Sequence, residues 1–167
     1  YFLDTMLPEN SEWDRGLTNY LYGGDQHYRL CQEVILGMGG VAMLRALDFE
    51  AMHSYHMNEG HSALLTLALL QEYSRRSGHN PPAAHDVESV RKHCVFTTHT
   101  PVPAGHDKFP LALARQVLGG ETATMLESLD GVPDGVLNMT HLALALSRYV
   151  NGVAMRHGQI SRDMFPG

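Results

Sequence analysis

The chain has 167 residues, of which 44% are hydrophobic and 18% charged, which is typical of a folded domain and not of a disordered segment. The formal net charge of -6 at pH 7 argues against nucleic acid or an anionic membrane as partner, because both select clustered positive charge. No apolar run reaches the roughly 18 residues of a membrane helix, and no export signal is recognisable. We therefore expect one cytoplasmic domain, or part of one, without a membrane partner.

The two cysteines, Cys31 and Cys94, lie far apart on apolar segments, which favours free thiols in a reducing compartment over a disulfide. The sequence opens on a strand-like run, Tyr1 to Asp4, without an initiator Met, and it ends directly after a helix-like segment. We therefore expect an internal piece of a longer protein.

An amphipathic helix is predicted from Gln26 to Leu47, after the turn signal Gly23-Gly24-Asp25, because apolar residues recur there at helical spacing. Gly37, Gly39 and Gly40 lie inside this helix, where each costs up to about 1 kcal/mol relative to alanine. We expect another backbone or a ligand to approach the helix at these glycines.

A strand, a helix and a second strand are predicted next. Met52 to Met57 and Cys94 to Thr98 have strand character. Between them, the run 63–70 is apolar nearly all round, which predicts a buried helix that continues to about Arg76. Asn58 is expected to cap that helix, and a short helix over 86–93 is expected before the second strand.

Such a strand-helix-strand unit is parallel and right-handed in nearly all cases. The segments Asn58 to His61 and His99 to Pro103 both leave the carboxyl ends of its strands, so they should lie on one rim of the sheet. Ligands of open α/β sheets bind at that rim.

The remainder is predicted to be helical. The expected helices run over 111–118 and 121–129, and a longer one follows Asn138 with an apolar face that extends to Val153. The predicted class is α/β, with parallel strands and a mostly helical C-terminal half.

Two local patterns offer other kinds of site. Val34 to Ala42 fits a strand followed by G-x-G-x-x-A, with Glu59 about 20 residues on, as in a dinucleotide site. The helical periodicity that begins at Leu30 opposes this interpretation. His53, His56 and His61 suggest a metal site, but their spacing is not H-E-x-x-H, and hydrogen-bonded imidazoles are the simpler expectation.

Four stretches together resemble the α-glucan (glycogen, starch or maltodextrin) phosphorylases, in the family's order and closest to its bacterial and archaeal branch. They are Tyr28 to Glu33, His56 to Ser62, Phe96 to Asp107, and Leu137 to Thr140 continuing through Ser147 to Val153. The muscle-type enzymes carry Asp where Glu59 stands here.

The resemblance implies a fold and an activity. Family members are glycosyltransferases with two Rossmann-like domains, the GT-B arrangement, each a three-layer sandwich, and they cleave α-1,4-glucan with phosphate to glucose 1-phosphate. Residues 1–167 would form part of the N-terminal domain. Pyridoxal phosphate and its anchoring lysine belong to the C-terminal domain, which this chain lacks, so no turnover is expected from the chain alone.

The resemblance also implies the site residues. His99 would face the glucose at the cleavage point, its backbone carbonyl stabilising positive charge at the anomeric carbon and its imidazole binding the 6-hydroxyl. Asn58, Glu59, His61 and Thr100 would line the sugar pocket. Whether Glu59 reaches the sugar or only caps a helix stays open.

Three other functions are compatible with the sequence. They are a non-catalytic glucan-binding or assembly module, a nucleotide-binding (NAD) protein, and a helical scaffold that self-associates through exposed sheet edges or apolar faces.

Overall fold

Three parallel strands form the central sheet of this computed structural model, which describes residues 1–21, 23–99, 106–129 and 132–153. The strands are β1 (Tyr55–Asn58), β2 (Cys94–Thr98) and β5 (Tyr149–Gly152), with β2 in the middle. Tyr55 pairs with Cys94 and Asn58 with Thr97, both in parallel register. The prediction of two neighbouring parallel strands is confirmed, although the first strand begins at Tyr55 and not at Met52.

The two faces of the sheet differ in burial, because successive side chains of a strand point to opposite faces. Met57 and Phe96 are fully buried in one hydrophobic core with leucines of α4 (Leu65–Ser77) and Val90 of α5 (Ala84–His93). His56 and Asn58 are exposed on the opposite face of β1. The α/β class is confirmed, and the parallel sheet is compatible with a Rossmann-like fold.

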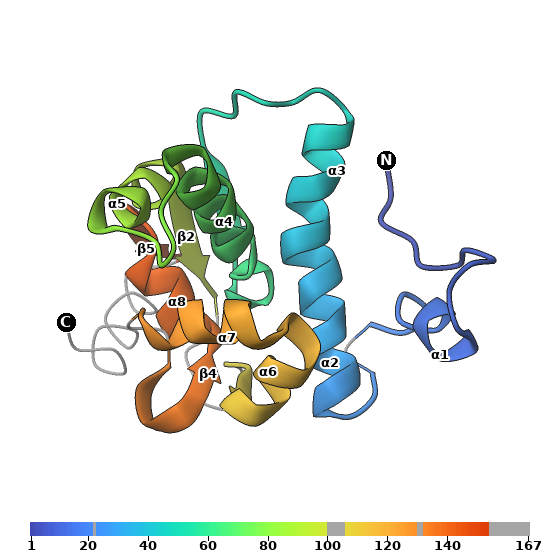
Figure 1. The fold of residues 1–167 in the computed structure, drawn as a ribbon. Helices are drawn as coiled ribbons and strands as arrows, with labels where there is room; N and C mark the ends of the chain where they lie inside the picture. Colours follow the sequence, from blue (N-terminus) through green and yellow to red (C-terminus); the bar gives the residue numbers. More distant parts are fainter. Residues whose placement is uncertain (22, 100–105, 130–131, 154–167) are drawn as a thin grey trace.

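The predicted helix over 26–47 exists as one long rod with an unpredicted turn inside it (Figure 1). The rod consists of α2 (Gln26–Val34), the π-helical turn η1 (Ile35–Gly39) and α3 (Gly40–Ala46). The Asp25 side chain begins α2 by accepting a hydrogen bond from the Tyr28 backbone N–H at 2.9 Å. Because Val34 to Leu36 are helical, the strand required by a dinucleotide site is not present, and that alternative is wrong.

Gly37 is the point where α4 meets this rod. A methyl group at Gly37 would lie 2.7 Å from the backbone nitrogen of Leu65, closer than a real contact allows. The expectation that another backbone approaches the glycine-rich stretch is therefore confirmed at Gly37.

The opening residues do not form the expected strand. Tyr1 and Phe2 are each 94% exposed, and within the described ranges they pair with no other strand. The short helix α1 (Glu12–Arg15) follows. This N-terminal segment is held against α2, where Tyr28 Oη donates to the Gly16 carbonyl at 2.6 Å and Gln32 Nε2 donates to the Leu17 carbonyl at 2.9 Å.

The C-terminal half contains more strand than predicted. Its elements are β3 (Lys108–Pro110), α6 (Leu111–Leu118), α7 (Gly120–Glu127), the 3-10 turn η4 (Pro133–Gly135), β4 (Val136–Asn138), α8 (Met139–Ala145) and β5, with β3 and β4 antiparallel. The long helix predicted after Asn138 is wrong, because α8 ends at Ala145 and the chain enters the sheet. The Arg148 N–H donates to the Cys94 carbonyl at 3.0 Å and so directs β5 alongside β2.

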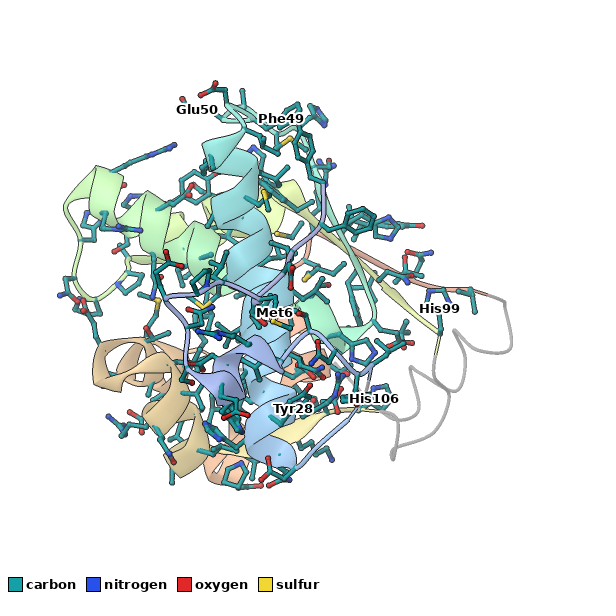
Figure 2. The ribbon with its side chains drawn as sticks, turned by 90° about the vertical axis from the view of Figure 1, so that its right-hand side faces the viewer. Met6, Tyr28, Phe49, Glu50, His99 and His106 are labelled. Atoms are coloured by element: carbon teal, nitrogen blue, oxygen red, sulfur yellow. The ribbon has the colours of Figure 1, made fainter. Side chains whose placement is uncertain are left out.

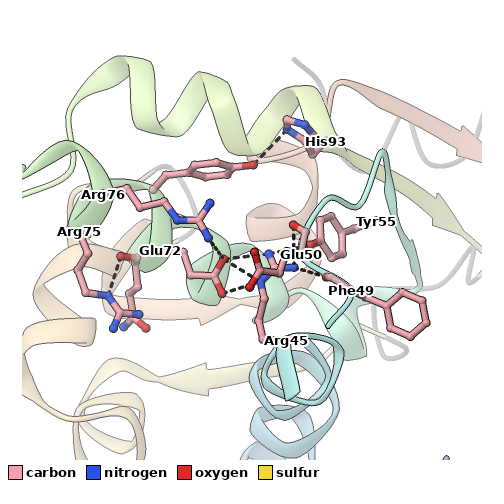
Figure 3. Close-up of polar contacts among 10 residues, drawn as sticks. Arg45, Phe49, Glu50, Tyr55, Glu72, Arg75, Arg76 and His93 are labelled. Carbon is pink, nitrogen blue, oxygen red and sulfur yellow. Dashed lines mark hydrogen bonds and ion pairs between the residues drawn. The ribbon is translucent and has the colours of Figure 1, made fainter. Parts of the chain in front are cut away.

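Arg45 joins α3, α4 and β1 (Figure 3). Its guanidinium donates to both Glu72 carboxylate oxygens at 2.9–3.2 Å, to Tyr55 Oη at 3.0 Å and to the Phe49 carbonyl at 2.7 Å. These contacts fix the connection between the long rod and the sheet. Within the described ranges no helix is both long and apolar enough to cross a membrane.

Candidate functional site

The carboxyl ends of β1 and β2 bring three predicted site residues together, and we call Asn58, Glu59 and His99 the rim. The His99 backbone N–H donates to the Glu59 carboxylate, and His99 Nε2 contacts Asn58 Oδ1. Because an amide oxygen only accepts hydrogen bonds, Nε2 carries the proton in this contact, and Nδ1 of a neutral ring is then an acceptor. Figure 2 shows His99 at the outer end of its strand.

Glu59 adopts a backbone conformation that side chains rarely take. Its φ is 68° and its ψ is 173°, a region that is populated almost only by glycine. Its N–H still donates to the Thr97 carbonyl at 2.9 Å, so the sheet ladder continues one residue beyond β1. The 3-10 turn η2 (Gly60–Ser62) begins after it without a side-chain cap, and the prediction that Asn58 caps a helix is wrong.

A row of polar side chains extends from the rim across the sheet face that carries His56 and Asn58. Thr97 Oγ1 donates to Asn151 Oδ1 at 2.8 Å, and His56 Nε2 lies 2.7 Å from the same hydroxyl. Since the single hydroxyl proton of Thr97 goes to Asn151, His56 Nε2 is the donor to Thr97. All three strands therefore contribute a polar group to one face.

A second group, the Arg29 cluster, consists of Arg29, Glu33, His61 and Asp107. Arg29 Nη2 lies 2.9 Å from His61 Nδ1, 3.0 Å from Asp107 Oδ2 and 3.1 Å from Glu33 Oε1. The cluster joins α2, the η2 turn and the segment before β3, and Met139 N–H donates to the Asp107 carbonyl at 3.1 Å. A pocket of about 340 Å³ adjoins it, lined by Arg29, Glu33 and His61 and by apolar side chains of the N-terminal segment and the long rod.

The two carboxyl groups of the Arg29 cluster have opposite pKa shifts. Burial, followed by the charge of Asp107, raises the pKa of Glu33 to about 10, and its side chain is 1% exposed. Burial alone would also raise the pKa of Asp107, but hydrogen bonds from His61, Arg29 and Glu33 outweigh it and hold that pKa well below its usual range. At neutral pH Glu33 is therefore the protonated partner and Asp107 the carboxylate.

Glu33, His61 and Asp107 have ligand atoms close enough for a metal ion, but a cation is already among them. Arg29 Nη2 lies within 3.1 Å of all three groups, so it takes the position that a metal would need. The metal site suggested by His53, His56 and His61 is wrong, because His53 contacts Ser54 and the other two belong to separate clusters.

Pyridoxal phosphate requires a lysine in an enclosed phosphate-binding pocket. The chain has two lysines. Lys92 is exposed near the end of α5, next to the amino end of β2 and away from the rim, and Lys108 is exposed on β3. These residues do not fit the cofactor.

The structure describes the position of every predicted site residue except Thr100. Asn58, Glu59 and His99 meet, while His61 turns to the Arg29 cluster; Thr100 lies outside the described residues. Thr97, Asn151 and the partners of His61 were not foreseen as site residues. The sequence indicates them only in that they lie within the four stretches that resemble the α-glucan phosphorylases. Their contacts join distant parts of the chain, which no local pattern predicts.

The comparisons with known proteins agree with these stretches. No family model matches the chain. It is 38% identical over 180 residues to a glycogen phosphorylase of Mycobacterium tuberculosis, covering 98% of this chain and 21% of that protein. It is 40% identical over 172 residues to a maltodextrin phosphorylase of Thermococcus litoralis, covering 99% of this chain and 20% of that protein. A glycogen phosphorylase of Aquifex aeolicus is 32% identical over 174 residues, covering 99% of this chain and 25% of that protein.

The chain thus spans about a fifth to a quarter of the length of these curated relatives, and the alignments include the rim, the Arg29 cluster and β5. The chain is therefore a homologue of the glycogen and maltodextrin phosphorylases, the α-glucan phosphorylase family, and it corresponds to one segment of these longer proteins.

Proposed function

We propose that this chain supplies the sugar-facing wall of the active site of an α-glucan phosphorylase. The complete enzyme would cleave the terminal α-1,4 link of a glucan with phosphate and release glucose 1-phosphate. The observation that carries the proposal is the meeting of Asn58, Glu59 and His99 at the carboxyl ends of adjacent parallel strands, where open α/β sheets bind ligands.

In this proposal His99 contacts the glucose in two ways. Its backbone carbonyl points a fixed dipole at the anomeric carbon as positive charge develops there, which stabilises the transition state without reorganisation. Its Nδ1 accepts a hydrogen bond from the 6-hydroxyl, because Nε2 is already engaged by Asn58. Glu59 acts as a positioning residue, since its carboxylate accepts the His99 N–H.

The remaining parts of the catalytic machinery come from elsewhere in the complete protein. We place residues 1–167 in the N-terminal domain of a GT-B enzyme, with pyridoxal phosphate, its lysine and the phosphate-binding residues on the other domain. Thr100 and His61 are retained as proposed sugar-pocket residues. The free thiols Cys31 and Cys94 are compatible with the reducing cytoplasm, where we expect the enzyme.

The test is phosphorolysis of maltodextrin by the complete enzyme with His99→Ala. We expect kcat/KM to fall by about 100- to 1,000-fold, as the loss of an aligned transition-state contact does. The matched control is His53→Ala, an exposed histidine next to β1 that contacts only Ser54 among the hydrogen bonds described. Circular dichroism and the melting temperature establish that both variants are folded.

Kinetics of the His99→Ala variant equal to those of the His53→Ala variant would remove His99 from the site. The chain alone, supplied with pyridoxal phosphate, is expected to release no glucose 1-phosphate. Clear turnover by the chain alone would contradict the proposal that the cofactor and the phosphate-binding residues belong to the other domain. A complete protein that binds maltodextrin but never turns it over would instead support a non-catalytic glucan-binding module.

A further inference from the structure

Two histidines and one aspartate gather where α4 passes into α5. His79 follows Gly78, the left-handed residue that ends α4, and His85 and Asp86 lie in the first turn of α5. His79 Nδ1 is 3.0 Å from Asp86 Oδ2, and His85 Nε2 is 3.3 Å from Asp86 Oδ1. One ligand atom from each residue therefore lies within 4.8 Å of the other two, which is close enough to share one ion.

Backbone hydrogen bonds hold Asp86 and His79 in this group, and His85 packs on His79. Asp86 is 1% exposed, and its Oδ2 accepts the Ala83 N–H at 2.9 Å. The His79 N–H donates to the Ser74 carbonyl at 2.9 Å, which anchors the first histidine to the end of α4. The two imidazole rings pack edge to face, with their centroids 4.7 Å apart.

The charge and exposure of the group also suit a cation. Asp86 contributes the acidic donor of the group: its Oδ2 also accepts the Ala83 N–H, and its Oδ1 lies 3.3 Å from His85 Nε2. The side chains of His79 and His85 are 36% and 63% exposed, so an ion and its water can reach them from solvent. The Arg29 cluster differs, because a guanidinium lies among its ligand atoms.

We propose that His79, His85 and Asp86 bind a divalent transition metal of the zinc class, with water completing a four-coordinate site. Two imidazole nitrogens and one carboxylate oxygen are a donor set that Zn²⁺ accepts, whereas Mg²⁺ and Ca²⁺ prefer oxygen ligands throughout.

The position of the site indicates a structural role. The metal would link the end of α4 to the start of α5, two helices that pack against each other in the core. The 13 residues of α4 correspond to about 20 Å of helix, so the metal lies well away from the rim, near which α4 begins. It would stabilise the fold without entering the proposed reaction.

The test is calorimetric titration of Zn²⁺ into the full protein that carries this chain, with the visible spectrum of Co²⁺ as a second probe. We expect one equivalent to bind at this site and Co²⁺ to show the intense bands of four-coordination. His79→Ala and His85→Ala should each weaken binding at least about tenfold, as loss of a ligand does. Zn²⁺ at about 100 times its dissociation constant should also raise the melting temperature, by about 1–2 °C in a protein of the relatives' length.

The matched control is His53→Ala, which removes an exposed histidine outside the group and should leave both affinity and thermal shift unchanged. If His79→Ala does not fold, His79→Asn retains a hydrogen-bond donor toward Asp86 without an imidazole ligand. Asp86→Asn likewise retains an acceptor for the Ala83 N–H but loses the charged ligand. Zn²⁺ binding that is absent, or that is equally strong in the His53, His79 and His85 variants, would overturn the proposal.

Discussion

Glu59 combines a strained backbone with a side chain that holds His99. Its φ of 68° and ψ of 173° cost about 1–3 kcal/mol for a residue other than glycine. Its carboxylate accepts the backbone N–H of His99 across the rim. The rim therefore stores strain at the residue that positions the proposed catalytic group, which is the usual place for such strain in a functional site.

Replacing Glu59 by alanine and by glycine separates these two features. Both variants lose the hydrogen bond to His99, but only glycine accepts the backbone conformation without strain. We expect Glu59→Gly to be more stable than Glu59→Ala by about 1 kcal/mol or more in urea denaturation. Glycine ordinarily stabilises a protein less than alanine because it loses more chain entropy on folding. The opposite order would show that the conformation at this position is relaxed in solution.

The sequence predicts the meeting of Asn58 and His99 for a general reason. Residues at the carboxyl ends of two strands in one right-handed parallel unit lie on the same edge, whatever their identity. It could not predict the contact between Glu59 and the His99 N–H, because that contact depends on a positive φ that the residue type disfavours. The salt bridge of Arg29 with Asp107 joins positions 78 residues apart, and no local pattern indicates it.

Gly37 determines how closely two elements pack, because it lies where α4 begins beside the long rod. A methyl group there would be 2.7 Å from Leu65 N and 3.0 Å from the Leu64 carbonyl carbon, and both of these are backbone atoms that cannot move aside alone. Gly40 lies in the same rod with helical dihedral angles, and a methyl group there would meet no described atom within 4 Å.

These two glycines should respond to alanine with opposite signs. Gly37→Ala is expected to lower the free energy of unfolding by about 1–3 kcal/mol through overpacking. Gly40→Ala is expected to raise it by about 0.5–1 kcal/mol through helix propensity. Urea denaturation of both variants measures the difference. Destabilisation of equal size in the two variants would mean that the close approach at Gly37 is not what requires glycine.

Periodicity identified most elements but mistook β5 for the continuation of a helix. Met139, Leu142, Leu146 and Val150 keep helical spacing, yet Val150 pairs with Phe96 in the sheet. The helix ends because the Arg148 N–H bonds to Cys94 and the following residues find a strand beside them. Spacing alone cannot reveal that partner, because it comes from a distant part of the chain.

At the scale of the whole molecule, the Arg29 cluster joins α2, the η2 turn and the segment before β3 into one unit. The pKa of Glu33 is raised from its ordinary 4.5 to about 10 in the folded state, so its carboxyl group keeps its proton at neutral pH. Between these values the folded state binds more protons than the unfolded state, so stability falls as pH rises. Asp107, with its lowered pKa, acts in the opposite direction, but its contribution is lost only as pH falls through a more acidic range.

Glu33→Gln should therefore flatten the decline of stability with pH. Glutamine is neutral at every pH, so this variant has no carboxyl group to lose a proton at this position. In the parent protein, that proton changes the free energy of unfolding by at most about 1.4 kcal/mol per pH unit. We expect the variant to lose less free energy of unfolding than the parent protein between pH 7 and 9.5, as measured by urea denaturation. Glu88→Gln, at an exposed position on α5, is the control and should retain the parent slope. Parallel slopes for all three proteins would contradict a protonated Glu33.

The described sheet has two open edges, β1 and β5, and Tyr149 on β5 is 61% exposed. Such edges invite pairing with further chain, either from the same protein or from a second copy. The expectation of self-association through these edges stays a prediction.

The π-helical turn determines the direction in which the side chains of α3 point relative to those of α2. Glu33 and Arg45 are separated by twelve positions, which in an uninterrupted α-helix would point them about 120° apart around the axis. One extra residue absorbed in η1 turns the second half back by about 100°, so that both side chains point nearly the same way. Three residues on one side of the rod then contact the η2 turn and α4 in order: Glu33 lies near His61, Gly37 near Leu65, and Arg45 at Glu72. Because of this extra residue, one continuous helix contacts the proposed sugar-pocket residue His61 through Glu33 at one end. At its other end it binds α4 through Arg45.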